Sequence, residues 1–196
     1  MNNIFFTADD HFGNESIIRY CSRPFKSVEE MDEALITNWN NKVKPGDTVY
    51  NLGDFCFINK REDILKLRAR LNGNIILVEG NHDDNIGNPG NFGFASKHKI
   101  LEVKINGCHI TLCHFSMNVW PRSHYDSWSL FGHTHGTFEG VGKSMDVGVD
   151  PNGYAPVSFE EVKAIMEKKP HNLNWLEKLK AFDRKEYEDY RSTEMS

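Results

Sequence analysis

The sequence lacks a long apolar run and an excess of basic residues. No stretch of its 196 residues approaches the roughly 18 apolar residues that a membrane-spanning helix needs. The opening residues 1–13 also lack the basic region and apolar stretch of a secretory signal. The net charge is −5 at pH 7, whereas passive nucleic-acid binders usually carry a basic face. We therefore expect no membrane association and no stable nucleic-acid partner.

Cysteine is scarce and forms no recognisable pattern. There is no CxxC pair and no disulfide-like framework among the four cysteines, which are Cys21, Cys56, Cys108 and Cys113. This pattern excludes a closed thiolate zinc site and favours buried thiols in a reducing compartment, so we expect a cytoplasmic protein. Histidine is more frequent, with nine residues, most of them in or near glycine-rich junctions.

The first half of the chain alternates strands and helices. Apolar runs predict strands over residues 3–8, 48–52 and 74–79. A capping box of Ser27 and Glu30 opens an amphipathic helix that ends before the segment KPGD. A second helix is predicted over about residues 60–71.

The second half is rich in hairpins. Residues 98–105 and 108–115 flank Asn106-Gly107, a strong signal for a hairpin with a type I′ turn. Further strands are expected over 127–132, 144–149 and 154–158, and a capping box of Ser158 and Glu161 predicts a helix. We therefore predict an α/β protein in which two mixed β-sheets pack as a sandwich with helices outside. Residues 1–169 would form one domain, and the charged residues 170–196 a helix or tail of the same unit.

Residues that can bind metals follow five of the predicted strands. Because ligands collect at the carboxyl ends of strands in α/β sheets, these side chains are expected to converge. Oxygen and imidazole ligands without cysteine suit Mn²⁺, Fe or Zn²⁺. The set exceeds the needs of one ion and fits two; its members are Asp9, His11, Asp54, Asn81, His114, His133 and His135.

Two such ions would lie about 3.5–4 Å apart and carry four positive charges. Two aspartate ligands cancel only two of these charges, so the centre would attract a phosphate oxyanion and stabilise its displacement. The ions would also lower the pKa of a bridging water molecule, which makes hydroxide available near neutral pH.

Five ordered motifs resemble those of calcineurin-like metallophosphoesterases. They are DDH from residue 9, GDF from 53, GNHD from 80, CHF from 113 and GHTH from 132. The resemblance implies a four-layer α/β/β/α fold with a dinuclear centre holding Mn²⁺, or alternatively Fe, Zn²⁺ or Ni²⁺. It places Asp9, His11 and His135 on one metal, Asn81, His114 and His133 on the other, and Asp54 between them.

The resemblance also suggests catalytic roles beside the metals. A metal-bridging hydroxide would attack phosphorus, and His82 would protonate the leaving oxygen, with Asp83 orienting it; the alternative for Asp83 is helix or turn capping. Arg122 and Arg23 are candidates for binding the substrate phosphate.

The resemblance favours a phosphodiester of a small nucleotide-like or cyclic substrate. A phosphomonoesterase or nucleotidase on the same centre is the second reading, and a non-catalytic metal-binding domain is the third. The oligomeric state is not specified by the sequence.

Overall fold

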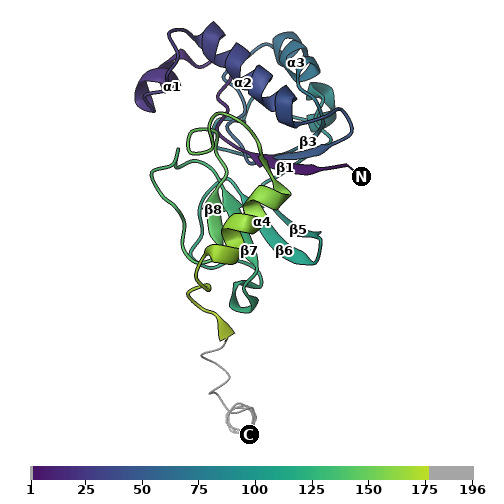
Figure 1. The fold of residues 1–196 in the computed structure, drawn as a ribbon. Coiled ribbons are helices and arrows are strands. Elements are labelled where there is room, and N and C mark those ends of the chain that lie inside the picture. Colours follow the sequence, from purple (N-terminus) through teal and green to yellow (C-terminus); the bar gives the residue numbers. More distant parts are fainter. Residues whose placement is uncertain (1, 177–196) are drawn as a thin grey trace, which may run out of the picture.

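Two β-sheets form the centre of the computed structural model, which describes residues 2–176 (Figure 1). The first sheet is parallel except for its last strand. In spatial order it contains β4 (Ser96–His98), β3 (Asn74–Val78), β2 (Thr48–Asn51), β1 (Ile4–Thr7) and β9 (Val157–Ser158). Parallel pairing of β1, β2 and β3 brings their carboxyl ends to one edge of the sheet.

The second sheet begins with the predicted hairpin. Its spatial order is β5 (Ile100–Ile105), β6 (Cys108–Cys113), β7 (Trp128–Phe131) and β8 (Ser144–Asp146). Asn106 and Gly107 both have positive φ, 47° and 87°, as a type I′ turn requires. Strands β6, β7 and β8 are parallel, so their carboxyl ends also share an edge.

Helices flank the two sheets. The described helices are α1 (Glu15–Tyr20), α2 (Val28–Lys42), α3 (Arg61–Arg70) and α4 (Phe159–Lys168), with short 3₁₀ turns at Pro89–Phe92 and Ser123–Tyr125. Helices α2 and α3 lie on the first sheet, and α4 lies along the second (Figure 1). The capping box at Ser158 and Glu161 is present as predicted. None of the helices in this range has the length and apolar character that a bilayer crossing requires.

The hydrophobic core consists of two clusters, because alternate side chains of a strand point to opposite faces of its sheet. In β1, Phe5 packs with the helices of the first layer, whereas Phe6 packs with residues of the second sheet. The predicted sandwich of two mixed sheets with helices outside is therefore confirmed. The boundary at residue 169 remains a prediction, and most of the predicted C-terminal segment, residues 177–196, lies outside the described part of the chain.

Candidate metal centre

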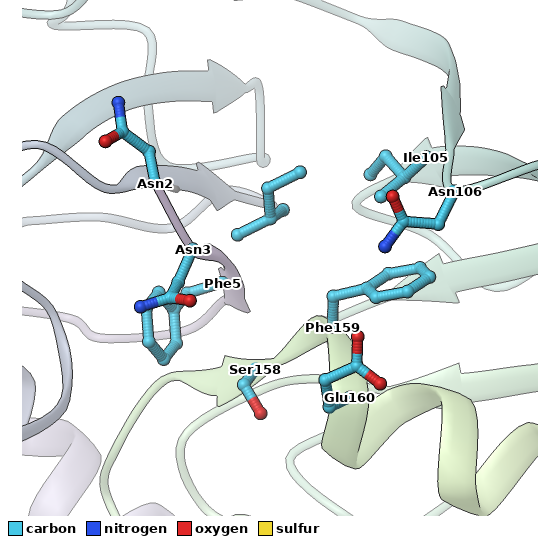
Figure 2. Close-up of a pocket in the computed structure, with 9 residues that line it drawn as sticks. Asn2, Asn3, Phe5, Ile105, Asn106, Ser158, Phe159 and Glu160 are labelled. Carbon is cyan, nitrogen blue, oxygen red and sulfur yellow. The ribbon is translucent and has the colours of Figure 1, made fainter.

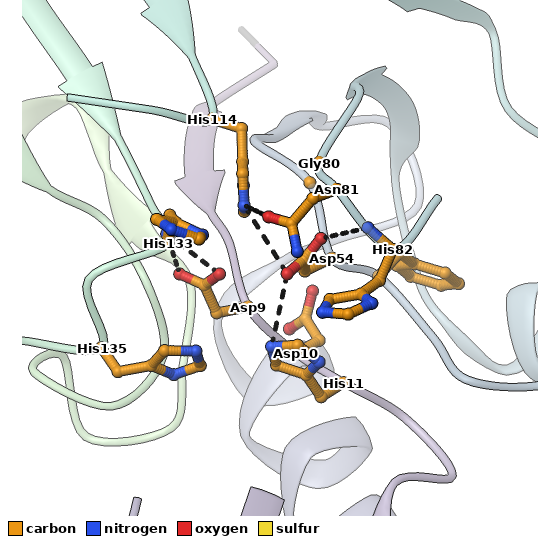
Figure 3. Close-up of polar contacts among 12 residues, drawn as sticks. Asp9, Asp10, His11, Asp54, Gly80, Asn81, His82, His114, His133 and His135 are labelled. Atoms are coloured by element: carbon orange, nitrogen blue, oxygen red, sulfur yellow. Dashed lines mark hydrogen bonds and ion pairs between the residues drawn. The ribbon is translucent and has the colours of Figure 1, made fainter. Parts of the chain in front are cut away.

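The loops after five strands bring all seven predicted metal ligands to one place (Figure 3). Asp9 and His11 follow β1, Asp54 follows β2, and Asn81 follows β3. The second sheet contributes His114 after β6, and His133 and His135 after β7. The site therefore lies where the carboxyl edges of the two sheets meet.

The first group of donor atoms comprises Asp9, His11 and His135, whose ligand atoms lie within 4.8 Å of one another. The imidazoles of His11 and His135 stack with 5.2 Å between their centroids. Both ring nitrogens of His11 are buried without a hydrogen-bond partner among the described residues. Burial lowers the pKa of His11 to about 2, and the nearby His135, Arg23 and His82 act in the same direction, so the ring of His11 is neutral. A neutral imidazole with a free lone pair fits a metal ion.

The second group comprises Asp54, His114 and His133, again within 4.8 Å of one another. The Asn81 side-chain oxygen lies 3.1 Å from Nε2 of His114. On its other side, Nδ1 of His114 lies 2.7 Å from the backbone oxygen of Leu52, which fixes Nε2 toward the centre. Burial lowers the pKa of His114, which favours the neutral form that binds metals.

The carboxylate of Asp54, a member of the second group, also lies close to the first group. Its Oδ2 atom is 3.7 Å from Nε2 of His11 and 3.6 Å from Nε2 of His114. One buried carboxylate thus faces a histidine of each group, which is the geometry that a shared ligand needs.

Burial and repulsion between carboxylates both disfavour the ionised form of Asp9 in the centre. Burial raises the pKa of Asp9 well above its ordinary value, and the nearby Asp146, Asp54 and Asp150 raise it further. A divalent cation would relieve this repulsion, so the chemistry of the donor set fits metal ions.

Several candidate ligands occupy the left-handed backbone region that non-glycine residues rarely adopt. Positive φ values between 48° and 68° occur at Asp9, His11, Asp54, His133 and His135. Such backbone strain costs on the order of 1–3 kcal/mol per residue and concentrates at functional sites. These backbone conformations therefore lower the stability of the fold, but they direct the side chains toward the centre.

Glycines allow the loops to approach one another closely. A Cβ atom on Gly132 would lie 2.5 Å from Cβ of Ala8 and 2.7 Å from Oδ2 of Asp9. Without it, the backbone N–H of His133 reaches Oδ2 of Asp9 at 2.8 Å. Gly132 thus lets the loop after β7 dock against the first motif.

Arg23 does not face a substrate, and its predicted role is corrected. It is 3% exposed, and its Nε and Nη2 atoms each donate to Asp150 at 2.8 Å. Its guanidinium also donates to the backbone oxygens of Asp9 and Asp10 at 2.7 and 3.0 Å. Arg23 therefore fixes the backbone of the first motif.

Sequence reasoning missed Asp150. This carboxylate accepts from Arg23 and lies 2.7 Å from Nδ1 of His135, which turns the other ring nitrogen of His135 toward the centre. Burial raises the pKa of Asp150, but His135 and Arg23 outweigh that effect and hold it below its ordinary value. Two aspartates in the segment MDVGVD were the available signal.

Asp83 holds backbone amides and not the ring of His82. Its Oδ2 accepts from the N–H groups of Asp54 and Gly80 at 2.8 Å, and its Oδ1 from that of Phe55 at 3.0 Å. The predicted orientation of His82 by Asp83 is thereby corrected; the alternative of capping accounts only for the local bond to Gly80, and the other two bonds are long-range. Asp83 ties the loop that carries Asp54 to the loop after β3.

Arg122 lies at the opposite end of the second sheet. It lines a hollow with His109 and Trp128, at the amino-terminal ends of β6 and β7. His114 lies five residues beyond His109, on the order of 16 Å away along an extended strand. The expectation that Arg122 contacts the substrate phosphate is therefore corrected as well.

A competing donor group lies beside the first one. Cys21, His135 and Asp150 also have ligand atoms within 4.8 Å of one another. Asp150 is already paired with Arg23, however, and burial raises the pKa of the Cys21 thiol to about 11. A protonated thiol and an occupied carboxylate are poor ligands, so this group is the weaker candidate.

A hollow beside the sheets has a different character (Figure 2). Its volume is about 460 Å³, and it lies near Asn2 and Asn3 at the amino-terminal end of β1, away from Asp9. Glu160 is the only ionisable residue among the described ones that line it. It offers no group comparable with the metal centre.

The two sheets, whose strand ends bring two Asp/His donor groups together, match the sandwich fold that the resemblance implies.

Comparison with known proteins gives one family relationship. The chain is 35% identical over 176 residues to the uncharacterized protein MJ1445 of Methanocaldococcus jannaschii, an alignment that covers 86% of this chain and 93% of that protein. It belongs to the same family as MJ1445. No protein-family model matches the chain.

Several solved structures are similar to the fold, including the following two. The protein of unknown function AQ665 from Aquifex aeolicus is 25% identical, with a TM-score of 0.69 over 84% of this chain and 100% of that one. An archaeal phosphodiesterase is 19% identical, with a TM-score of 0.44 over 74% of this chain and 82% of that one.

Proposed function

We propose that the protein is a metal-dependent phosphoesterase with two divalent cations, and that phosphodiesters are its substrates. The observation that carries this proposal is the position of Asp54, between one group of donors around His11 and another around His114. One cation would bind Asp9, His11 and His135, the other Asn81, His114 and His133, and Asp54 would contact both. When bound, the cations supply positive charge for the phosphate oxygens and acidify water.

His82 is the proposed proton donor to the leaving oxygen. Its backbone N–H donates to Oδ1 of Asp54 at 2.9 Å, which ties its position to the centre. Its side chain is exposed, and its ring centroid lies 5.9 Å from that of His11. An exposed imidazole beside the reacting phosphate is placed to pass a proton to a departing alkoxide.

The charge around the site favours a diester over a monoester. A phosphodiester carries one negative charge at neutral pH, and a monoester carries nearly two. Arg23 is held by Asp150, and Arg122 lies at the other end of the second sheet, so neither adds to the cations in binding phosphate. A phosphomonoesterase or nucleotidase remains the second proposal for the same centre, and a metal-binding domain without turnover the third.

The donor set bears on the choice of metal, and the free cysteines bear on the cellular compartment. Carboxylate, amide and imidazole donors suit Mn²⁺, with Fe, Zn²⁺ and Ni²⁺ as alternatives. Cys21, Cys56, Cys108 and Cys113 are all free thiols, which is consistent with the reducing cytoplasm.

Turnover of two chromogenic esters tests the proposal. Protein loaded with Mn²⁺ should hydrolyse bis-p-nitrophenyl phosphate faster than p-nitrophenyl phosphate. Asp54→Ala should abolish both activities, and the control Asp63→Ala should retain them because Asp63 pairs with Lys66 on the surface. Preference for the monoester would favour the phosphomonoesterase, and bound metal without turnover of either ester would favour the non-catalytic domain. Full activity of Asp54→Ala would refute the shared-ligand role.

A further inference from the structure

Two exposed phenylalanines flank the candidate metal centre. Phe57 is 39% exposed, and its ring centroid lies 4.7 Å from that of His82 and 5.4 Å from that of His11. Phe115 is 47% exposed and lies 4.8 Å from His133 and 5.0 Å from His114. Figure 3 shows His82 and His133 on opposite sides of Asp54. The two phenyl rings therefore border different sides of the site.

The backbone of each phenylalanine is fixed. The N–H of Phe57 donates to the backbone oxygen of Phe12 at 2.8 Å, directly after the first motif. Phe115 follows His114, whose backbone oxygen accepts from Gly132 at 2.9 Å. Each phenylalanine therefore projects from a backbone segment that is hydrogen-bonded next to a candidate ligand.

The chemistry of these rings points to planar organic groups. Single exposed apolar residues are common on protein surfaces and need no explanation. Phenyl rings beside the expected position of the phosphate differ from such scattered residues. They have no polar atom that could bind the phosphate or hydrogen-bond to water. Their faces suit stacking with a planar group such as a nucleobase.

We propose that Phe57 and Phe115 are specificity-determining residues that contact the two organic arms of a nucleotide diester. This inference rests on the proposed function, which places the phosphorus between the two donor groups. Phe57 touches His82, the proposed proton donor, and so lies beside the leaving arm. Phe115 touches His114 and His133 and lies beside the arm that stays on the phosphate, where it stacks with the base.

Binding of thymidine 5′-phosphate tests the role of Phe115 independently of diester hydrolysis. Calorimetry on the Mn²⁺-loaded protein should show that Phe115→Ala weakens this ligand about tenfold, as loss of one base stack implies. Affinity for methyl phosphate, which has no base, should not change. Phe115→Tyr should restore binding, and the control Tyr125→Ala should have no effect, since Tyr125 lines the hollow at the far end of the sheet. Equal weakening of both ligands, or of neither, would overturn the inference.

Kinetics with two diesters separate the two rings. Thymidine 5′-p-nitrophenyl phosphate and methyl p-nitrophenyl phosphate share a leaving group and differ in the retained arm. Phe115→Ala should raise KM about tenfold for the thymidine ester alone, whereas Phe57→Ala should raise KM for both. If the wild type hydrolyses both esters but Phe115→Ala keeps its preference, the inference fails while the proposed function stands. Failure of the wild type to hydrolyse either ester would refute the proposed function, and the binding measurement would still decide the role of Phe115.

Discussion

Replacing Arg23 with methionine tests the support beneath the first motif. The guanidinium makes two 2.8 Å hydrogen bonds to Asp150 and donates to the backbone oxygens of Asp9 and Asp10. Methionine keeps the apolar stem but removes all of these donors. Because breaking a buried ion pair leaves an uncompensated charge, the free energy of unfolding should fall by about 3–5 kcal/mol.

Urea unfolding followed by circular dichroism measures this loss, with EDTA present so that metal binding does not contribute. Arg70→Met is a matched control, because Arg70 also donates twice to one carboxylate, that of Glu33, but on the surface. The control should lose at most about 1 kcal/mol. A loss at Arg23 no larger than that at Arg70 would refute the reasoning.

Two other substitutions give further predictions. His82→Ala should retain both metals by elemental analysis and lose rate, least for good leaving groups such as p-nitrophenolate; equal losses for good and poor leaving groups would argue against a proton donor. Burial raises the pKa of Asp32 from 3.8 to about 6, although the N–H of Gly13 lowers it. The folded state therefore binds the proton more tightly, and the stability of wild type relative to Asp32→Asn should fall as pH rises from about 4 to 6. An unchanged difference across that range would contradict this assignment.

Local signals were sufficient for much of the fold. The Asn106-Gly107 turn, the capping box at Ser158 and the apolar runs each encode their geometry within a few residues. Where the chain changes sheet, local reasoning failed: residues 98–105 were predicted as one strand, but His98 ends β4 in the first sheet and Ile100 begins β5 in the second. The apolar periodicity continues where the chain passes from one sheet to the other, so the sequence pattern does not reveal the change of sheet.

In the candidate site, too, some features could be predicted from the local sequence and others could not. The seven candidate ligands could be predicted to converge because each follows a strand, and parallel strands end at one edge. The role of Arg23 depends on Asp150, which is 127 residues away in the sequence, and that pairing exists only in the folded chain. The position of Arg122 was also not predictable locally, because the loop after β6 returns to the amino-terminal end of that strand before β7 begins.

Diffraction from crystals grown with Mn²⁺ tests the central claim, that the strand ends build a two-metal centre. The anomalous difference map should contain two peaks about 3.5–4 Å apart, with the carboxylate of Asp54 touching both. One peak should contact Asp9, His11 and His135, and the other Asn81, His114 and His133. A single peak, or a peak bound by Cys21, His135 and Asp150, would contradict the account.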